Sequence, residues 1–316
     1  MVQNFSTMWL AFLALAGGLS LLFFGGEMLV AGASRLARRL GMSPLLVGLT
    51  VVAFGTSMPE MFVSLAATFQ NHADIMIGNV VGSNIANVGL VLGVSALLMP
   101  LPVRHSQVYT ELYLLLAASL GVAAISWFGV FYRPFGLIFV GALIIYTVQA
   151  YRGEAKKNRE NGNSPDNSGP SMFKITGQLV VGLAFLAVGS DFFIDGAVDV
   201  ALHFGVSELV IGLTLAAVGT SLPELASSIA AVRHGEPQIL VGNVVGSNLF
   251  NLLMVMGVTA VIKPFSFAPE MMVRDLPAMI MFSALLWPIV YYRHGVNRSH
   301  GLVMIAGYVC YLLLLV

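Results

Sequence analysis

An internal duplication limits the architecture of this chain more than any other feature of its sequence. Segment 41–93 aligns with segment 205–257 without a gap, at a spacing of 164 residues, and 26 of the 53 aligned positions are identical. The match continues upstream, where GGEMLVAGA (25–33) lies on GSDFFIDGA (189–197). Such self-similarity indicates two copies of one structural unit.

Both copies are too apolar for a water-soluble domain. The chain is 58% hydrophobic and 9% charged, whereas soluble domains carry about 25% charged residues. Apolar stretches of about 20 residues recur along it, each long enough to cross about 30 Å of hydrocarbon. We therefore predict an all-α integral membrane protein in contact with the lipid bilayer. Ten spans are expected, at residues 8–33, 43–70, 74–99, 108–128, 134–151, 174–201, 207–232, 237–262, 276–292 and 301–316.

These spans predict a single membrane domain over residues 1–316, with one five-helix repeat at 1–151 and another at 174–316. The polar segment 152–173, rich in Asn, Gly, Ser and charge, is expected to be an exposed and mobile linker. Because each copy has an odd number of spans, the second copy enters the membrane from the opposite side. The repeats should therefore be inverted, as in many secondary transporters.

The basic residues indicate the orientation of the chain. With the N-terminus outside, 12 of the 15 Lys and Arg residues fall in the predicted cytoplasmic loops, including the linker. This distribution follows the positive-inside rule and places both termini outside. The short loops favour a bacterial inner membrane, and nothing in the sequence indicates a nucleic-acid partner or an obligatory protein partner.

Each copy carries a helix-breaking motif within an apolar span: GLTVVAFGTSMPEMFVS (48–64) and GLTLAAVGTSLPELASS (212–228). Proline removes a backbone donor and clashes with the preceding turn, and glycine loosens that turn. We expect broken helices near the membrane midplane, around residues 55–59 and 219–223. The carbonyl groups freed by a break survive only where they face protein or a polar cavity.

Glu60 and Glu224 lie beside these breaks. An ionised carboxylate at the centre of a bilayer costs at least about 2.5–3.5 kcal/mol on insertion scales. No Lys or Arg lies at comparable depth in the predicted spans, which leaves bound cations or protons as the compensating charges.

A second motif follows each break at the same distance, so that the repeated core covers residues 48–93 and 212–257. It reads GNVVGSNIAN in the first copy and GNVVGSNLFN in the second. In each, a Ser and an Asn four residues apart share one helical face. These residues are Ser83 and Asn87, and Ser247 and Asn251. Their oxygen atoms suit Ca²⁺ and also Na⁺, whereas the lack of deep Cys and His disfavours zinc or copper.

The number of buried carboxylates suggests a mechanism. Two carboxylates neutralise one Ca²⁺, two Na⁺ or two protons, so a site that accepts these ions alternately can exchange them. A return without ions would carry two bare carboxylates through hydrocarbon, and that cost would enforce coupling.

The paired GTSMPE and GTSLPE motifs, each followed by GNVVGSN, resemble the repeats of the calcium/cation antiporter superfamily, in its prokaryotic-type sodium/calcium exchanger family. The resemblance implies exchange of one Ca²⁺ for several Na⁺ by alternating access. It implies no enzymatic activity and no cofactor beyond the transported ions. It also implies that the spans carrying Glu27 and Asp191 slide past the core.

The resemblance implies a ligand set for these ions, position by position. The acidic ligands would be Glu60 and Glu224. The hydroxyl ligands would be Thr56, Ser57, Thr220, Ser221, Ser83 and Ser247. Asn87 and Asn251 would supply amide groups, and Ala53 and Ala217 backbone carbonyls. Many family members carry Asp at one of the two Asn positions, so ion stoichiometry, proton sensitivity and K⁺ dependence stay open.

Several alternatives remain at this level. An H⁺/Ca²⁺ or other cation/proton exchanger fits the carboxylates nearly as well, and a channel is less favoured. An intramembrane serine enzyme is disfavoured because the six histidines lie near loops or span ends, which leaves no base for the serine.

For individual residues, structural interpretations compete with functional ones. Glu60 and Glu224 could be protonated acids at broken helices, and the motif glycines could serve helix packing. Asn79 and Asn243 could join helices or contact ions. Glu27 and Asp191 could line an ion path or bond near a helix end.

Overall fold

The computed structural model describes residue 5 and residues 7–103, 105–160, 169–205, 219–293 and 295–315. Within these ranges, eight helices are long and apolar enough to span a membrane, and the bent pair Pro44–Thr56 and Met58–Phe69 makes a ninth. The prediction of a multi-pass helical membrane protein is confirmed. The expected span 207–232 lies partly outside the described residues, which include only its final part.

The elements of the first copy follow one another with short connections. Four of them are long helices: α1 (Met8–Leu40), α5 continuing into α6 (Ala73–Leu98), α7 (His105–Trp127) and α8 (Arg133–Glu160). The broken span consists of α2 (Pro44–Val47), a π-helical turn (Gly48–Val52), α3 (Ala53–Thr56) and α4 (Met58–Phe69). A second π-helical turn, Asn87–Leu92, separates α5 (Ala73–Ala86) from α6 (Gly93–Leu98), and the strands are β1 (Leu101–Pro102) and β2 (Val130–Phe131).

The second copy repeats this order in its described part. It contains α9 (Met172–His203), α11 (Leu222–Arg233), α12 (Pro237–Leu249), a π-helical turn (Phe250–Val255) and α13 (Met256–Ile262). It continues with β3 (Phe265–Ser266), a π-helical turn (Met271–Asp275), α14 (Leu276–Arg293), β4 (Gly295–Val296) and α15 (Arg298–Leu315).

Helix α8 is longer than expected, because it runs through residues 152–160, which the sequence predicts as part of the linker. The sequence RGEAKKNRE consists largely of strong helix formers, which extend a helix beyond the membrane without needing an apolar face. The linker prediction is therefore wrong for this stretch, while residues 161–168 lie outside the described part of the chain.

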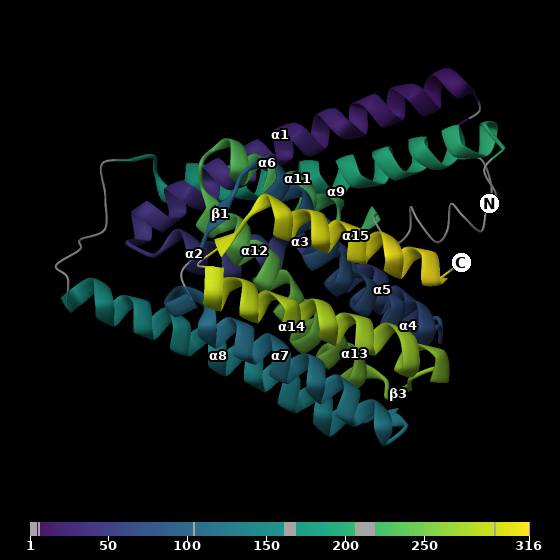
Figure 1. The fold of residues 1–316 in the computed structure, drawn as a ribbon. Coiled ribbons are helices and arrows are strands. Elements are labelled where there is room, and N and C mark those ends of the chain that lie inside the picture. The colour runs from purple at the N-terminus through teal and green to yellow at the C-terminus, as the bar shows by residue number, and fades with distance from the viewer. Residues whose placement is uncertain are drawn as a thin grey trace.

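Helices α1 and α9 lie side by side at one edge of the molecule, and α7 and α8 lie at the opposite edge (Figure 1). A Cβ atom at Gly18 would stand 2.7 Å from the carbonyl oxygen of Gly189, and one at Gly25 would stand 2.9 Å from that of Gly182. The order of these contacts shows that α1 and α9 are antiparallel. Only glycine allows two helix backbones to approach this closely.

The core between these edges is built from the repeated motifs. Helix α12 packs on α2, α3 and the intervening π-helical turn, while α4 packs on α5 and α11 on α12. Outside the core, α6 contacts α15, α8 contacts α13 and α7 contacts α14. The polar motif residues are thereby enclosed by helices of both copies.

Two pairs of very short strands connect the copies outside the helices. Leu101 and Pro102 of β1 pair with Val296 and Gly295 of β4, antiparallel. In the same way, β2 pairs with β3, where Phe131 stacks on Phe265 with ring centroids 5.3 Å apart. Each pair therefore takes one strand from each copy.

Candidate cation-binding site

The predicted break in the first copy lies at Ser57. The helix ends at Thr56, a new helix begins at Met58, and the two segments are bent by 42°. Pro59 stands in the first turn of α4, where its missing N–H and fixed φ are tolerated. In the second copy, Thr220 and Ser221 form a turn before α11 begins at Leu222, and the segment up to residue 218 is not described.

The two acids of the site occupy matching positions. Glu60 lies in the first turn of α4 and Glu224 in the first turn of α11, and each is 0% exposed. The amino end of a helix carries a partial positive charge, which partly stabilises a carboxylate there. Their carboxyl groups are close enough to repel each other electrostatically.

Hydrogen bonding leaves these carboxyl groups largely unsatisfied. Ser247 donates a 3.3 Å hydrogen bond to Oε1 of Glu224. Oε2 of Glu224 and both carboxyl oxygens of Glu60 have no partner among the described residues. Buried polar atoms without a partner are rare in proteins, and a site that binds an ion is one place where they occur.

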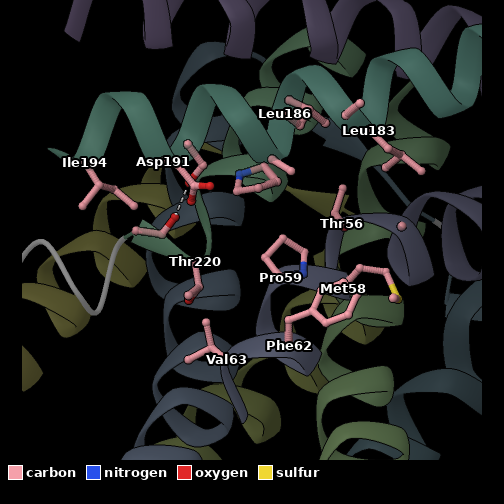
Figure 2. A pocket seen from close by; sticks show the side chains of 16 residues that line it. Thr56, Met58, Pro59, Phe62, Val63, Leu183, Leu186, Asp191, Ile194 and Thr220 are labelled. Carbon is pink, nitrogen blue, oxygen red and sulfur yellow. Dashed lines mark hydrogen bonds between the residues drawn. The ribbon is translucent and has the colours of Figure 1, made fainter. Parts of the chain in front are cut away.

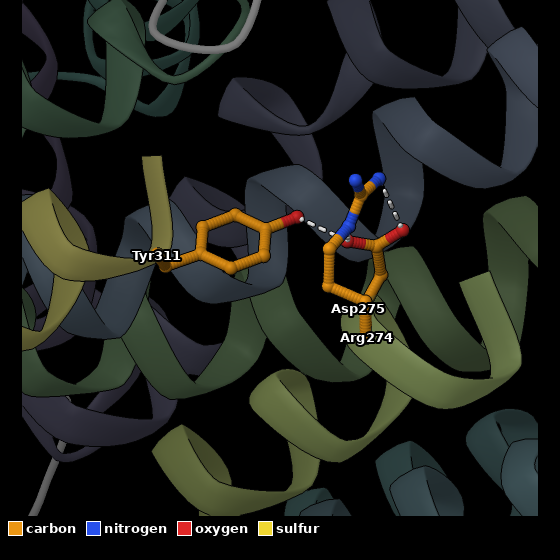
Figure 3. A network of polar contacts seen from close by, with 3 residues as sticks. All are labelled: Arg274, Asp275 and Tyr311. Carbon is orange, nitrogen blue, oxygen red and sulfur yellow. Dashed lines mark hydrogen bonds and ion pairs between the residues drawn. The ribbon is translucent and has the colours of Figure 1, made fainter. Parts of the chain in front are cut away.

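Asp275 shows how another buried acid of this protein is satisfied (Figure 3). It receives bonds of 3.0 and 3.2 Å from the Arg274 guanidinium and a 3.0 Å bond from the Tyr311 hydroxyl. No basic residue in the described part of the chain pairs with Glu60 or Glu224 in this way. The contrast separates a structural ion pair from the two acids at the breaks.

Hydroxyl groups join the two copies in matching pairs. Thr56 shares a 3.3 Å hydrogen bond with Ser247, and Thr220 shares a 3.2 Å hydrogen bond with Ser83. The hydroxyl of each break thus meets the second motif of the other copy. Thr56 also donates a 3.0 Å bond to the side-chain oxygen of Asn243.

The asparagines at matching positions of the two copies form different hydrogen bonds. Asn87 donates a 3.1 Å bond to Asn248, which donates a 3.3 Å bond to the backbone oxygen of Asn84. Asn251 is fully buried, and neither its oxygen nor its nitrogen has a partner among the described residues. Both Asn87 and Asn251 lie in π-helical turns, a geometry that is frequent at functional sites.

The remaining predicted ligands differ in their surroundings. Ser57 and Ser221 are buried, and their hydroxyls have no hydrogen-bond partner among the described residues. The backbone oxygen of Ala53 accepts the Ser57 N–H at 3.0 Å and the Thr56 hydroxyl at 3.4 Å. Ala217 lies outside the described residues.

The structure therefore gathers carboxylate, hydroxyl, amide and carbonyl oxygens within one buried region. Most buried side-chain polar atoms without a partner in the described part belong to these motifs. No group of three or more His, Cys, Asp or Glu side chains occurs there that could hold a metal ion. Such a donor set matches hard cations such as Ca²⁺ and Na⁺ and does not match zinc or copper.

Sequence reasoning missed the bridging role of the Asn248 side chain, which contacts Asn87 and the backbone of Asn84, although Asn248 belongs to the GNVVGSN motif. The repetition of this third asparagine was the available signal. Asn79 donates bonds of 3.0 and 2.9 Å to the Glu60 carbonyl and to the Ser64 hydroxyl. This arrangement supports its structural interpretation, since it ties α5 to the start of α4.

Glu27 and Asp191 occupy equivalent positions in the two copies but have different surroundings. At the carboxyl end of α11, Glu27 forms an ion pair with Arg233, at 3.4 Å, and a 2.8 Å hydrogen bond with the His234 ring. Asp191 instead lines a cavity of about 490 Å³ between α9 and the two breaks (Figure 2). Thr56 and Thr220 line the same cavity.

Comparison with known proteins agrees with this geometry. A family model described as sodium/calcium exchanger protein matches residues 10–152 and 174–316. The putative antiporter CaxA of Alkalimonas amylolytica is 37% identical over 94% of this chain and 96% of its own length. The sodium/calcium exchanger MaX1 of Methanosarcina acetivorans is 32% identical over 96% and 98%, respectively.

A solved structure of the sodium–calcium exchanger NCX_Mj, soaked with Na⁺ and Sr²⁺, superposes with a TM-score of 0.84. It is 31% identical in sequence, and the match covers 97% of this chain and 99% of that one. The family match and these full-length likenesses cover nearly all of the chain, including both copies of the repeat. The chain therefore belongs to the sodium/calcium exchanger family of cation antiporters.

Proposed function

We propose that this protein exchanges Ca²⁺ for Na⁺ by alternating access, at a mid-membrane site that contains Glu60 and Glu224. The observation that carries the proposal is the pair of fully buried carboxyl groups, three of whose oxygens have no partner among the described residues. Two negative charges in this position require compensation, and one Ca²⁺ or two Na⁺ supplies it. The names of MaX1 and NCX_Mj support the choice of ions.

The ligands that we propose extend beyond the acids. The hydroxyls are those of Thr56, Ser57, Thr220, Ser221, Ser83 and Ser247, the amides are those of Asn87 and Asn251, and the carbonyls are those of Ala53 and Ala217. The unpartnered oxygens of Ser57, Ser221, Asn87 and Asn251 support their inclusion. The carbonyl of Ala53 accepts the Ser57 N–H at 3.0 Å, and its second lone pair is open to an ion when the Thr56 hydroxyl donates to Asn243.

The architecture that we propose is ten helices in two inverted repeats, 1–151 and 174–316. Shifting the bounds of α5–α6 by 164 residues gives those of α12–α13, and α1 shifts onto α9 within one residue. The antiparallel contact of α1 with α9 is what inversion requires of two matching helices. A bacterial inner membrane, with both termini outside and residues 152–173 in the cytoplasm, fits the distribution of basic residues.

The transport assay that tests this function uses the whole protein reconstituted in liposomes. An outward Na⁺ gradient should drive accumulation of ⁴⁵Ca²⁺, and removal of the gradient should stop it. If a pH gradient drives uptake and a Na⁺ gradient does not, the protein is the alternative H⁺/Ca²⁺ exchanger. Uptake that needs no counter-ion gradient would indicate a channel and would contradict the proposal.

A further inference from the structure

We infer that Asp191 is an access residue for the transported cations: it attracts them into the cavity that ends at Thr56 and Thr220. The inference rests on the proposed function, because it assumes that cations reach the site between the breaks. It assigns a role to a residue outside the ligand set.

The first observation is the position of Asp191 within the cavity. Besides Thr56 and Thr220, the walls consist mainly of apolar or small residues, such as Pro59, Phe62 and Leu183 (Figure 2). Asp191 is the ionisable side chain among the residues that line this cavity. Ser190, the other polar residue on this stretch of α9, donates its hydroxyl to the carbonyl of Gly219 at 2.8 Å. Apolar walls screen a charge poorly, so the carboxylate of Asp191 adds an attractive field for cations within the cavity itself.

The second observation is a cavity of about 320 Å³ at the matching position of the other copy. Shifting by 164 residues relates Leu183 and Leu186 to Leu19 and Leu22, which line this cavity too. The same shift relates Asp191 to Glu27, and Phe62 to Ala226. This second cavity does not include Thr56 or Thr220, so it does not reach the hydroxyls of the breaks.

The charges of the two cavities differ as well. Glu27 contacts Arg233 and His234, whereas no described residue forms an ion pair or a hydrogen bond with Asp191. The cavity that reaches the breaks thus has a carboxylate without a partner among the described residues, while the carboxylate of the other cavity is paired with Arg233. A role in helix packing would not predict this difference, but a role in attracting cations does.

The third observation is a row of acidic residues along one face of α9. Asp191, Asp195 and Asp199 are four residues apart and so lie on one helix face. Asp195 experiences the charges of both neighbours. Asp199 is buried and accepts a 2.7 Å bond from the backbone N–H of Phe5 near the helix end. These acidic residues run from near the end of α9 to the cavity, and Asp191 is the member that lines it.

The experiment measures initial rates of ⁴⁵Ca²⁺ uptake against external Ca²⁺ in right-side-out and inside-out membrane vesicles. In D191N, the apparent KM for Ca²⁺ should rise by roughly three- to ten-fold on one membrane face at low ionic strength. The maximal rate should be retained. Because exposed charges are screened beyond about 10 Å at 0.1 M salt, added N-methylglucamine chloride should reduce the difference.

Two variants serve as controls. D191E keeps the charge and should restore the apparent KM, which also shows that the position tolerates substitution. E27Q changes the matching acid and should not raise the apparent KM on the face that D191N affects. An unchanged KM in D191N, or a lower maximal rate with unchanged KM, would overturn the role of Asp191. The wild type tests the proposed function separately, since its failure to move Ca²⁺ would appear without any substitution.

Discussion

The cavities beside Asp191 and Glu27 occupy matching positions in the two copies, yet one reaches the breaks and the other does not. In the first, the carboxylate is free of described partners and Thr56 and Thr220 are part of the wall. In the second, Arg233 pairs with the carboxylate and His234 forms a hydrogen bond with it. A hydrogen bond from Ser34 of α1 to Glu236 adds a contact to the same region. Two copies of similar sequence thus adopt different local states within one molecule.

This difference teaches that the two copies are less alike in their cavities than in the proposed site. The proposed ligands are joined across the copies in near-equal pairs, as the Thr56–Ser247 and Thr220–Ser83 bonds show. The residues that line the two cavities differ in their contacts and ion pairs. Matching substitutions in the proposed site should therefore have similar effects on transport in either copy, whereas matching substitutions in the two cavities should have different effects.

The largest effect is expected at the two acids. E60Q and E224Q should each lower the rate of Na⁺-driven Ca²⁺ uptake at least about 100-fold, because the bound Ca²⁺ would lose one of its two carboxylates and breaking a buried pair of opposite charges costs about 3–5 kcal/mol. Uptake by reconstituted protein is the measurement, and E270Q, at an exposed glutamate, is the matched control. Normal transport by either variant would exclude that acid from the site. A large effect of one alone would show that the copies are unequal in binding too.

A moderate effect is expected where α1 touches α9, between the two cavities. The Cβ atom of G189A would lie 2.8 Å from Cβ of Leu21, and that of G25A would lie 2.9 Å from the Gly182 carbonyl oxygen. Overpacking of this kind costs about 1–3 kcal/mol, so thermal unfolding in detergent should occur at lower temperature in both variants. G177A is the control, because its Cβ would meet no atom within 4 Å. If G189A, G25A and G177A unfold at the same temperature, the backbones of α1 and α9 are not in close contact in the protein.

The smallest effect is expected at the ion pair of the shallower cavity. The side chain of Arg233 is 52% exposed and that of Glu27 is 27% exposed, and exposed pairs contribute about 0.2–1 kcal/mol. R233Q and E27Q should therefore lower the unfolding temperature only slightly. The double variant should lose little more than either single variant, because both remove the same contact. Fully additive losses would show that the two residues do not interact.

Much of the site could be predicted from sequence because the duplication marks it twice. The broken helix at Ser57, the pairing of Glu60 with Glu224 and the second motif beside them all follow from repeated residue types. The π-helical turns could not be predicted, since one extra residue in a turn leaves no pattern in an apolar segment. The extension of α8 was missed because hydropathy marks the edge of the membrane and not the end of a helix.

The different contacts of Glu27 and Asp191 also could not be predicted from the sequence. Both are acids at matching positions, and the repeat predicts the same surroundings for both. Their surroundings differ because different helices pack against Glu27 and Asp191 in this structure. A duplicated sequence gives no indication of which copy has which packing. The same limit applies to Asn84 and Asn248. Both belong to the same motif, yet only Asn248 bridges the copies, while Asn84 donates to its own helix at Val80.

The short strand pairs have a consequence for how the chain is held together. Since β1–β4 and β2–β3 each pair a strand of one copy with a strand of the other, the main chain joins the copies there, and the stacking of Phe131 on Phe265 adds to the second pair. Together with the contacts of α1 with α9 and of α7 with α14, they bind one half of the polypeptide to the other along its whole length. The peptide segment 161–168 is then only one of several connections between the two halves. Cleavage there should leave a complex of two fragments that migrates as one particle in mild detergent.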